Sequence, residues 1–268
     1  MPHLPQRHPL LLIACLASAA LSACGGPAEQ SAPPAHQSTS TAATPAASPT
    51  PTATPRASRP STTEKVDCKK LKCIALTYDD GPSPLTPKLL KAFTDRKATA
   101  TLFMLGNAAE TYPKTVKQAH EQGFEIANHT YDHQAISGLS DAKVAWEVSK
   151  TNTALTRITG VQPTLMRPPY AARTSRTDTV VGTHGLAVVV WHNSPEDWVA
   201  GHNTASVITK LTVQRASRNA ILLMHDIHPW TVDAAAPTID ALQKQGYTLV
   251  TVSQLLGRTT PGKVYPAA

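Results

Sequence analysis

The chain has 268 residues, of which 41% are apolar, and its formal net charge is +7 at pH 7. This length is enough for one large domain with appendages, and the apolar content can supply a buried core. The basic residues form no dense Lys/Arg run, so we expect no nucleic-acid partner.

Residues 1–24 resemble an export signal. Arg7 makes a weakly basic start, and the apolar run at residues 9–21 is too short for a comfortable membrane span. The run ends in Leu-Ser-Ala-Cys-Gly, where Cys24 matches the cysteine that becomes lipidated in bacterial lipoproteins. We expect a protein anchored by lipid to the outer face of the cytoplasmic membrane. An ordinary cleaved signal with an incidental cysteine, and hence a secreted protein, is the alternative.

Residues 25–65 consist mostly of Pro, Ala, Ser and Thr and include no large apolar residue. Such a segment cannot bury enough surface to offset its chain entropy, so we predict a disordered linker. The folded domain is then expected at residues 66–258, followed by a C-terminal tail at residues 259–268.

Cys68 and Cys73 stand close together at the start of this domain, separated by four residues. In an exported protein, a small disulfide loop is the expected outcome of such a pair. A zinc site with this spacing is the alternative, but it would need further Cys or His ligands nearby, and the neighbouring sequence has none.

From residue 73 onward, apolar segments typical of strands alternate with segments typical of helices. Strands are predicted at residues 74–78, 99–105, 124–127, 164–166, 187–191, 220–224 and 248–250. Helices are predicted at residues 86–96, 115–122, 141–159, 175–184, 204–216 and 232–245, several of them ending at a glycine. Seven such alternations favour a parallel α/β fold, although periodicity alone does not separate an open sheet from a barrel.

Two adjacent carboxylates end the first predicted strand. Asp79 and Asp80 follow a buried apolar run and precede Gly-Pro-Ser, which breaks the strand. The C-terminal ends of strands are where α/β folds place their chemistry. Adjacent side chains on a strand point to opposite faces, so one aspartate could bind a metal while the other acts as a base. A solvated acidic turn is the alternative reading of this stretch alone.

Further polar clusters follow four later strands. His129 and His133 follow the third and are spaced as two ligands of one metal, which an aspartate could complete. Arg-Pro-Pro-Tyr follows the fourth strand, Asp-Trp stands after the fifth, and the sixth ends in a histidine behind four apolar residues. Each cluster alone has a purely structural explanation. Together, five clusters at five strand ends indicate an enzyme.

These clusters, in this order, resemble the five motifs of the polysaccharide deacetylase family, also called the NodB-homology domain. The matching stretches are Thr-Tyr-Asp-Asp-Gly-Pro-Ser, His-Thr-Tyr-Asp-His, Arg-Pro-Pro-Tyr, Asp-Trp and Leu-Met-His. The resemblance covers about residues 66–257. It implies a distorted (β/α) barrel of about seven βα units and the metal-dependent removal of acetyl groups from carbohydrate polymers.

The resemblance also implies roles for the residues at and beside the metal site. Asp79 corresponds to the general base, and Arg167 corresponds to the arginine that holds it. Asp80, His129 and His133 correspond to the metal ligands. The family metal is usually zinc, with cobalt or nickel as alternatives.

On the substrate side, Tyr170 matches the residue whose backbone N–H helps to bind the oxyanion. His225 matches the general acid, and Asp197 matches the carboxylate that tunes it. Trp198 and Leu223 match pocket-wall residues that receive the acetyl methyl group.

The expected substrate is an N-acetylated polysaccharide such as peptidoglycan or a chitin-type oligosaccharide. An O-deacetylase of the acetylxylan type is the alternative, because the same site would cleave the easier ester. A non-catalytic carbohydrate-binding member is a further alternative, but it would lack one of the catalytic groups. We expect a monomer that contacts the membrane only through its lipid anchor.

Overall fold

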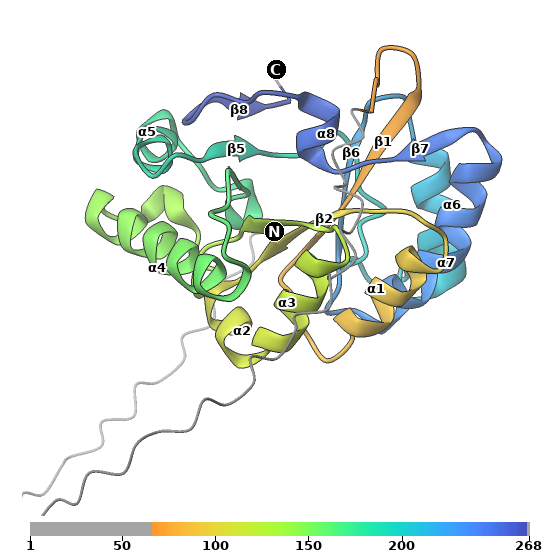
Figure 1. Ribbon diagram of the computed structural model, residues 1–268, viewed down its shortest axis with the longest axis horizontal. Helices are drawn as coiled ribbons and strands as arrows, with labels where there is room; N and C mark the ends of the chain where they lie inside the picture. The colour runs from red at the N-terminus through yellow and green to blue at the C-terminus, as the bar shows by residue number, and fades with distance from the viewer. Residues whose placement is uncertain (1–65, 267–268) are drawn as a thin grey trace, which may run out of the picture. The chain divides into compact units, whose positions relative to one another are not determined.

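The computed structural model describes residues 66–266. The predictions for the signal at residues 1–24, for lipidation of Cys24 and for the linker at residues 25–65 lie outside the described residues. The described part of the chain is coloured in Figure 1.

The described residues form one curled sheet of parallel strands in the order β6-β1-β2-β3-β4-β5-β8, with β7 paired to β1 (Figure 1). The strands are β1 Lys72–Asp79, β2 Thr101–Met104, β3 Glu125–Asn128, β4 Leu165–Met166, β5 Ala187–Val189, β6 Ile221–His225, β7 Tyr247–Leu249 and β8 Val264–Tyr265. The two sides of the sheet meet where Asn193, beyond β5, bridges to Leu222 of β6. The sheet is therefore a distorted barrel, as predicted.

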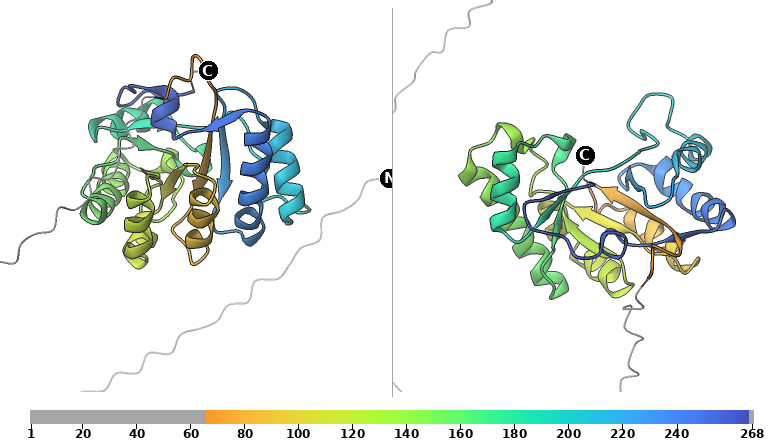
Figure 2. Two further views of the ribbon diagram at one scale, coloured as in Figure 1. Left: turned by 45° about the vertical axis from the view of Figure 1, so that its right-hand side comes forward. Right: turned by 90° about the horizontal axis from the view of Figure 1, so that it is seen from above.

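Helices connect the strands, and all but the last lie side by side along the outer face of the sheet (Figure 2). They are α1 Thr86–Thr94, α2 Gly106–Thr111, α3 Pro113–Glu121, α4 Asp141–Thr159, α5 Ser175–Thr183, α6 Ala205–Arg215, α7 Pro229–Lys244 and α8 Val252–Leu256. The longest, α4, is capped at its start by the Ser140 hydroxyl and ends at Gly160, whose φ of 76° is accessible to glycine at little cost. Short 3₁₀ turns occur at η1 Ile136–Gly138 and η2 Pro169–Ala171.

The two-residue alternation of β1 sorts its side chains between two apolar clusters. Ile74, Leu76 and Tyr78 pack outward with residues of α1 and α7. Ala75 belongs to the inner cluster of the barrel. Because every second side chain shares a face, Asp79 lies on the inner face with Ala75. The alternation thus places a carboxylate at the mouth of the barrel.

Three elements differ from the sequence analysis. Two short helices, α2 and α8, are found where we predicted none. The strand β8 lies within the segment that we treated as a C-terminal tail, and it pairs with β5. A two-residue strand leaves no alternation to detect, so the end of the domain was placed too early, at residue 258.

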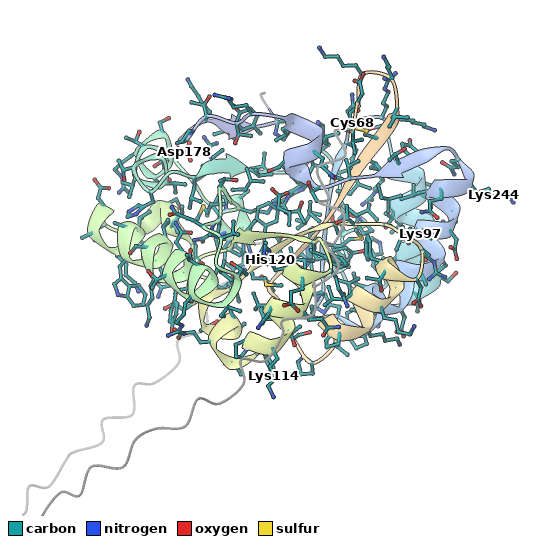
Figure 3. The ribbon with its side chains drawn as sticks, viewed as in Figure 1. Cys68, Lys97, Lys114, His120, Asp178 and Lys244 are labelled. Atoms are coloured by element: carbon teal, nitrogen blue, oxygen red, sulfur yellow. A yellow bond between two sulfur atoms is a disulfide. The ribbon has the colours of Figure 1, made fainter. Side chains whose placement is uncertain are left out.

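At the start of β1, Cys68 and Cys73 form a disulfide (Figure 3). The bond closes a short loop at the end of the strand that is remote from Asp79. Within residues 66–266, no helix combines the length and the apolar character needed to span a bilayer.

Candidate active site

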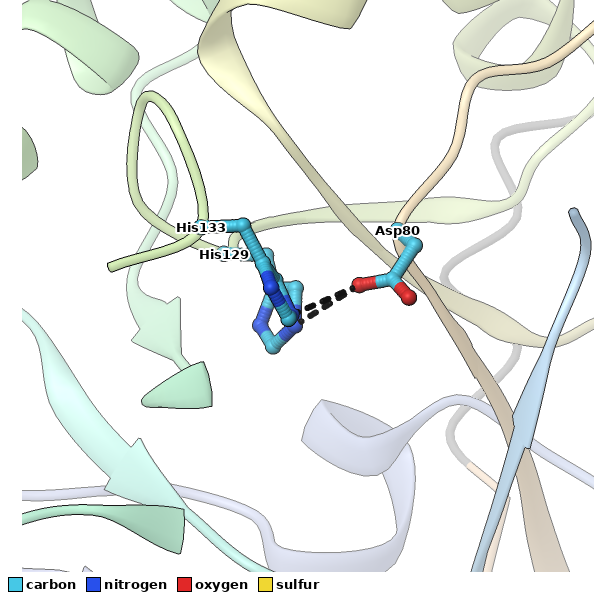
Figure 4. Close-up of side chains that lie close together, drawn as sticks. All are labelled: Asp80, His129 and His133. Atoms are coloured by element: carbon cyan, nitrogen blue, oxygen red, sulfur yellow. Dashed lines mark ion pairs between the residues drawn. The ribbon is translucent and has the colours of Figure 1, made fainter. Parts of the chain in front are cut away.

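Three predicted metal ligands converge at the C-terminal ends of β1 and β3 (Figure 4). Asp80 Oδ1 lies 3.2 Å from His129 Nε2 and 3.0 Å from His133 Nε2. Among the described residues, this is the one group of three or more His, Cys, Asp or Glu side chains close enough to share a metal ion.

The protonation of this cluster suits a cation. His129 Nδ1 lies 2.7 Å from the Arg167 carbonyl oxygen, so Nδ1 carries the proton and Nε2 presents a lone pair. Asp80 Oδ1 is buried without a hydrogen-bond partner. One carboxylate and two imidazoles therefore fit a divalent metal.

Asp79 occupies a different environment from its neighbour. Arg167 Nη1 donates to Asp79 Oδ1 and to Thr77 Oγ1, each at 2.7 Å. Arg167 is fully buried, and its other nitrogens donate to the carbonyls of Val189 and Val190 at 3.3 and 3.2 Å. The arginine therefore balances the charge of Asp79 and fixes its orientation at the inner end of the pocket.

Across the pocket, Asp197 holds His225. Asp197 Oδ1 lies 2.8 Å from His225 Nδ1, and Oδ2 accepts from the His225 backbone N–H at 2.8 Å and from Thr231 Oγ1 at 2.7 Å. Burial acts to lower the pKa of His225, but Asp197 outweighs it and the pKa is raised to about 9. At neutral pH, His225 is therefore protonated and presents Nε2–H as an acid.

A pocket of about 370 Å³ connects these groups. The predicted residues that line it are Asp79, Asp80, His129, His133, Tyr170, Trp198, Leu223 and His225. Arg167 and Asp197 lie behind it as partners of Asp79 and His225. A larger groove of about 610 Å³, partly lined by α4, includes none of these residues.

Two side chains of the rim are strongly exposed. Tyr170 is 72% exposed and Trp198 is 50% exposed, although both line the pocket. Trp198 meets the ring of His225 edge-on at 5.3 Å, and Tyr170 meets His133 edge-on at 4.7 Å. Exposed aromatic rings beside reactive groups form an amphipathic surface on which a ligand can stack.

Three further residues line the pocket: Pro168, which lies within the Arg-Pro-Pro-Tyr motif, and Trp191 and His228, which the sequence analysis missed. His228 stacks on Trp230 at 4.8 Å, and burial lowers its pKa. Its position three residues after His225, in the turn that leaves the same strand end, was the signal available in the sequence. Trp191 stands just past β5, at the end of a segment that we predicted as a strand.

The loops of the pocket carry most of the unusual backbone. Eight non-glycine residues among those described have a positive φ, and six lie in these loops: Asp80, Thr130, His133, Tyr170, Ala171 and Glu196. Such conformations are costly and persist where the surrounding contacts determine them, as is common at functional sites. The strain therefore marks the same region as the polar clusters.

Comparison with known proteins identifies the same family that the sequence motifs resemble. The family model described as polysaccharide deacetylase matches residues 67–189. The chain is 36% identical over 211 residues to a protein named peptidoglycan-N-acetylglucosamine deacetylase PgdA from Listeria monocytogenes, covering 77% of this chain and 44% of that protein. It is 36% identical to the peptidoglycan-N-acetylglucosamine deacetylase of Bacillus cereus, covering 69% of this chain and 88% of the relative.

A solved structure described as T48 deacetylase with substrate superposes with a TM-score of 0.71 at 37% identity, covering 75% of this chain and 99% of that one. The chain spans less than half the length of the first curated relatives that it matches. The match to the Bacillus cereus protein extends over most of both chains. On these grounds, together with the site geometry, the chain belongs to the polysaccharide deacetylase family.

Proposed function

We propose that this protein is a metal-dependent deacetylase that removes N-acetyl groups from a carbohydrate polymer, with peptidoglycan as the leading substrate. One observation carries the proposal. A carboxylate held by arginine and a protonated histidine held by aspartate face the same pocket as an Asp-His-His cluster. The names of the relatives support peptidoglycan as the substrate class.

Asp80, His129 and His133 would hold the metal, with zinc as the first choice and cobalt or nickel as alternatives. When bound there, the metal would polarise the acetyl carbonyl and lower the pKa of a water molecule. An acetamide is a poor electrophile, so hydrolysis near neutral pH needs this assistance.

Asp79 is the proposed general base. It lies beside the cluster, with Oδ2 at 3.7 Å from His129 Nε2, and Arg167 holds its other oxygen. Asp79 accepts the proton of the attacking water. Arg167 balances the charge of the carboxylate and orients it toward the pocket.

His225 is the proposed general acid. The amine of an amide leaves only when it is protonated, and a histidine with a pKa of about 9 carries the needed proton at neutral pH. Asp197 keeps Nδ1 engaged, so Nε2 is the nitrogen that delivers the proton.

Three further residues shape the substrate end of the pocket. The backbone N–H of Tyr170 would stabilise the negative charge that develops on the carbonyl oxygen. Trp198 and Leu223 supply apolar surface for the acetyl methyl group. The proposed unit of function is a monomer.

Acetate release tests the proposal directly. Purified protein should release acetate from peptidoglycan or chitooligomers, should lose this activity after exhaustive chelation, and should regain it with added zinc or cobalt. Full activity in protein shown by metal analysis to be empty would contradict the proposal. Release from acetylxylan but not from N-acetylated polymers would instead assign an O-deacetylase.

A further inference from the structure

Asp226 is a buried acid that the proposed reaction does not use. It follows His225 directly and is 2% exposed. Its Oδ1 has no hydrogen-bond partner. A carboxyl group is rarely buried so completely unless its surroundings use it, because removing it from water is costly.

The partners of Asp226 lie in the loop between β1 and α1, which begins with Asp80, and at the first residue of α1. Thr86 Oγ1 donates a short hydrogen bond to Asp226 Oδ2. The same Thr86 oxygen accepts from the Ser83 backbone N–H at 2.8 Å. Ser83 Oγ donates to the Asp226 carbonyl oxygen at 2.9 Å. Residue 226 is therefore tied to this loop through both its side chain and its backbone.

The carboxyl group of Asp226 also lies against the backbone of Gly81, the residue that follows Asp80. A Cβ atom added at Gly81 would stand 2.4 Å from Oδ1 and 2.5 Å from Oδ2. On the other side, the Gly81 carbonyl accepts from the Leu105 backbone N–H at 2.9 Å. The peptide next to Asp80 is thus confined between the end of β6 and the end of β2.

We propose that Asp226 is a positioning residue that holds Asp80 in its metal-binding orientation through Thr86 and Gly81. The inference rests on the proposed metal site. Asp80 has a φ of 73°, a strained value for aspartate that its surroundings must maintain. Asp226 directly follows β6, the strand that carries His225, and supplies that restraint. It therefore fixes the loop that begins with Asp80 relative to His225, the proposed general acid.

The Thr86 hydroxyl provides the cleanest test. Thr86→Val keeps the shape but removes both the donor to Asp226 and the acceptor of the Ser83 N–H, whereas Thr86→Ser keeps both. We expect Thr86→Val to weaken zinc affinity at least about tenfold, the scale on which outer partners of metal ligands act. Thr86→Ser should retain affinity to within about twofold. Zinc affinity is measured on folded protein at 25 °C by competition with a chromophoric chelator.

Thr212 offers a matched control. It is a fully buried threonine whose hydroxyl donates to the Ile208 carbonyl at 2.7 Å, within α6. Thr212→Val should lower the melting temperature and leave zinc affinity unchanged. An equal loss of affinity in Thr212→Val would show a general effect on the fold and overturn the inference.

Asp226→Ala supplies the second arm, and its loss of affinity should add less than fully to that of Thr86→Val, since both variants remove the hydrogen bond between Thr86 and Asp226. If Asp226→Ala does not fold, the two Thr86 variants decide alone. A folded Thr86→Val protein with unchanged zinc affinity overturns the inference even when the wild type is fully metal-dependent. Metal-independent acetate release by the wild type would instead refute the proposed function.

Discussion

Asp79 and Asp80 are neighbours in the chain, but their carboxylates have different partners. Asp79 is bonded to Arg167 at 2.7 Å, whereas Asp80 faces the two histidines. We therefore predict that Asp80→Asn loses the metal. Asp79→Asn should keep the metal and lose at least about 10²-fold in rate, the usual scale for a general base.

Metal content measured beside acetate release separates the two roles. Both variants are isosteric with the wild type, so a difference in metal content reports ligation and not a loss of packing. If Asp79→Asn loses the metal while Asp80→Asn retains it, the two assignments are reversed.

The bond between Asp197 and His225 makes a prediction about pH. The raised pKa of His225, about 9, keeps its acid form present below that pH, and the acid form is lost above it. Asp197→Asn removes the strongest of the interactions that raise this pKa, so the pKa should fall. The alkaline limb of the kcat/KM profile should therefore move to lower pH.

Asp178 on α5 provides the control for this experiment (Figure 3). It is another buried aspartate, paired with Arg173 and absent from the pocket lining. Asp178→Asn can reduce stability, but it should leave the alkaline limb in place. An unmoved limb in Asp197→Asn would mean that another group limits the reaction at high pH.

At the scale of residues, sequence reasoning succeeded where a polar group follows an apolar strand. Asp79, His129 and His225 stand out because their type changes abruptly at a strand end. Thr77 and Asp226 could not be recognised, although each is buried and bonded to a proposed site residue or its loop. Their importance lies in contacts with distant segments, which no local pattern records.

At the scale of elements, the length of each helix or strand decided whether it could be predicted from the sequence. All seven predicted strands and six predicted helices occur, with ends shifted by a few residues. The helices α2 and α8 have six and five residues, which is too short for a clear helical repeat. The strand β8 depends on pairing with β5 and has no pattern of its own.

The disulfide between Cys68 and Cys73 lies at the start of β1, at the opposite end of the strand from Asp79. Its cysteines are five positions apart in sequence, so it closes a small loop and should contribute about 2 kcal/mol. Replacing both cysteines by serine should lower the melting temperature by about 4–8 °C in a domain of this size. Acetate release at 25 °C should be unchanged, because Cys73 lies about 20 Å along the strand from Asp79.

Reduction of the wild type provides the matching control. A reducing agent should lower the melting temperature of the wild type to that of the Cys68→Ser/Cys73→Ser protein and should not affect the variant. A large loss of activity in the folded variant would show that the disulfide acts on the site, contrary to this expectation.

At the scale of the whole molecule, the alternation of helices and strands predicted a parallel α/β fold. It did not predict that the sheet closes into a barrel. Barrel closure requires the segment after β5 to reach β6, as the bridge from Asn193 to Leu222 does. These residues are far apart in sequence, and nothing local to either one indicates the other. The barrel was therefore predicted from the family resemblance and not from periodicity.

The proposed place of action follows from the N-terminal sequence. A lipidated Cys24 would tether the domain to the outer face of the cytoplasmic membrane through the Pro/Ala/Ser/Thr-rich segment at residues 25–65. Drawn out as polyproline II, a segment of this length spans about 120 Å, and as a coil roughly 35 Å. Either reach keeps the domain close to peptidoglycan, and a net positive chain is not repelled by an anionic wall.

Fractionation of cells tests this tether. The wild type should be found in the membrane fraction with a covalent lipid, and Cys24→Ala should move the protein to the medium. Activity of the released protein on soluble chitooligomers should stay unchanged, because the pocket lining found within residues 66–266 runs from Asp79 to His228. Cys15→Ala serves as the control, since this cysteine stands inside the apolar run of the signal and should not affect anchoring. A wild type that is already free of lipid and released would refute the anchor, and a soluble polymer outside the cell would then become the better candidate substrate.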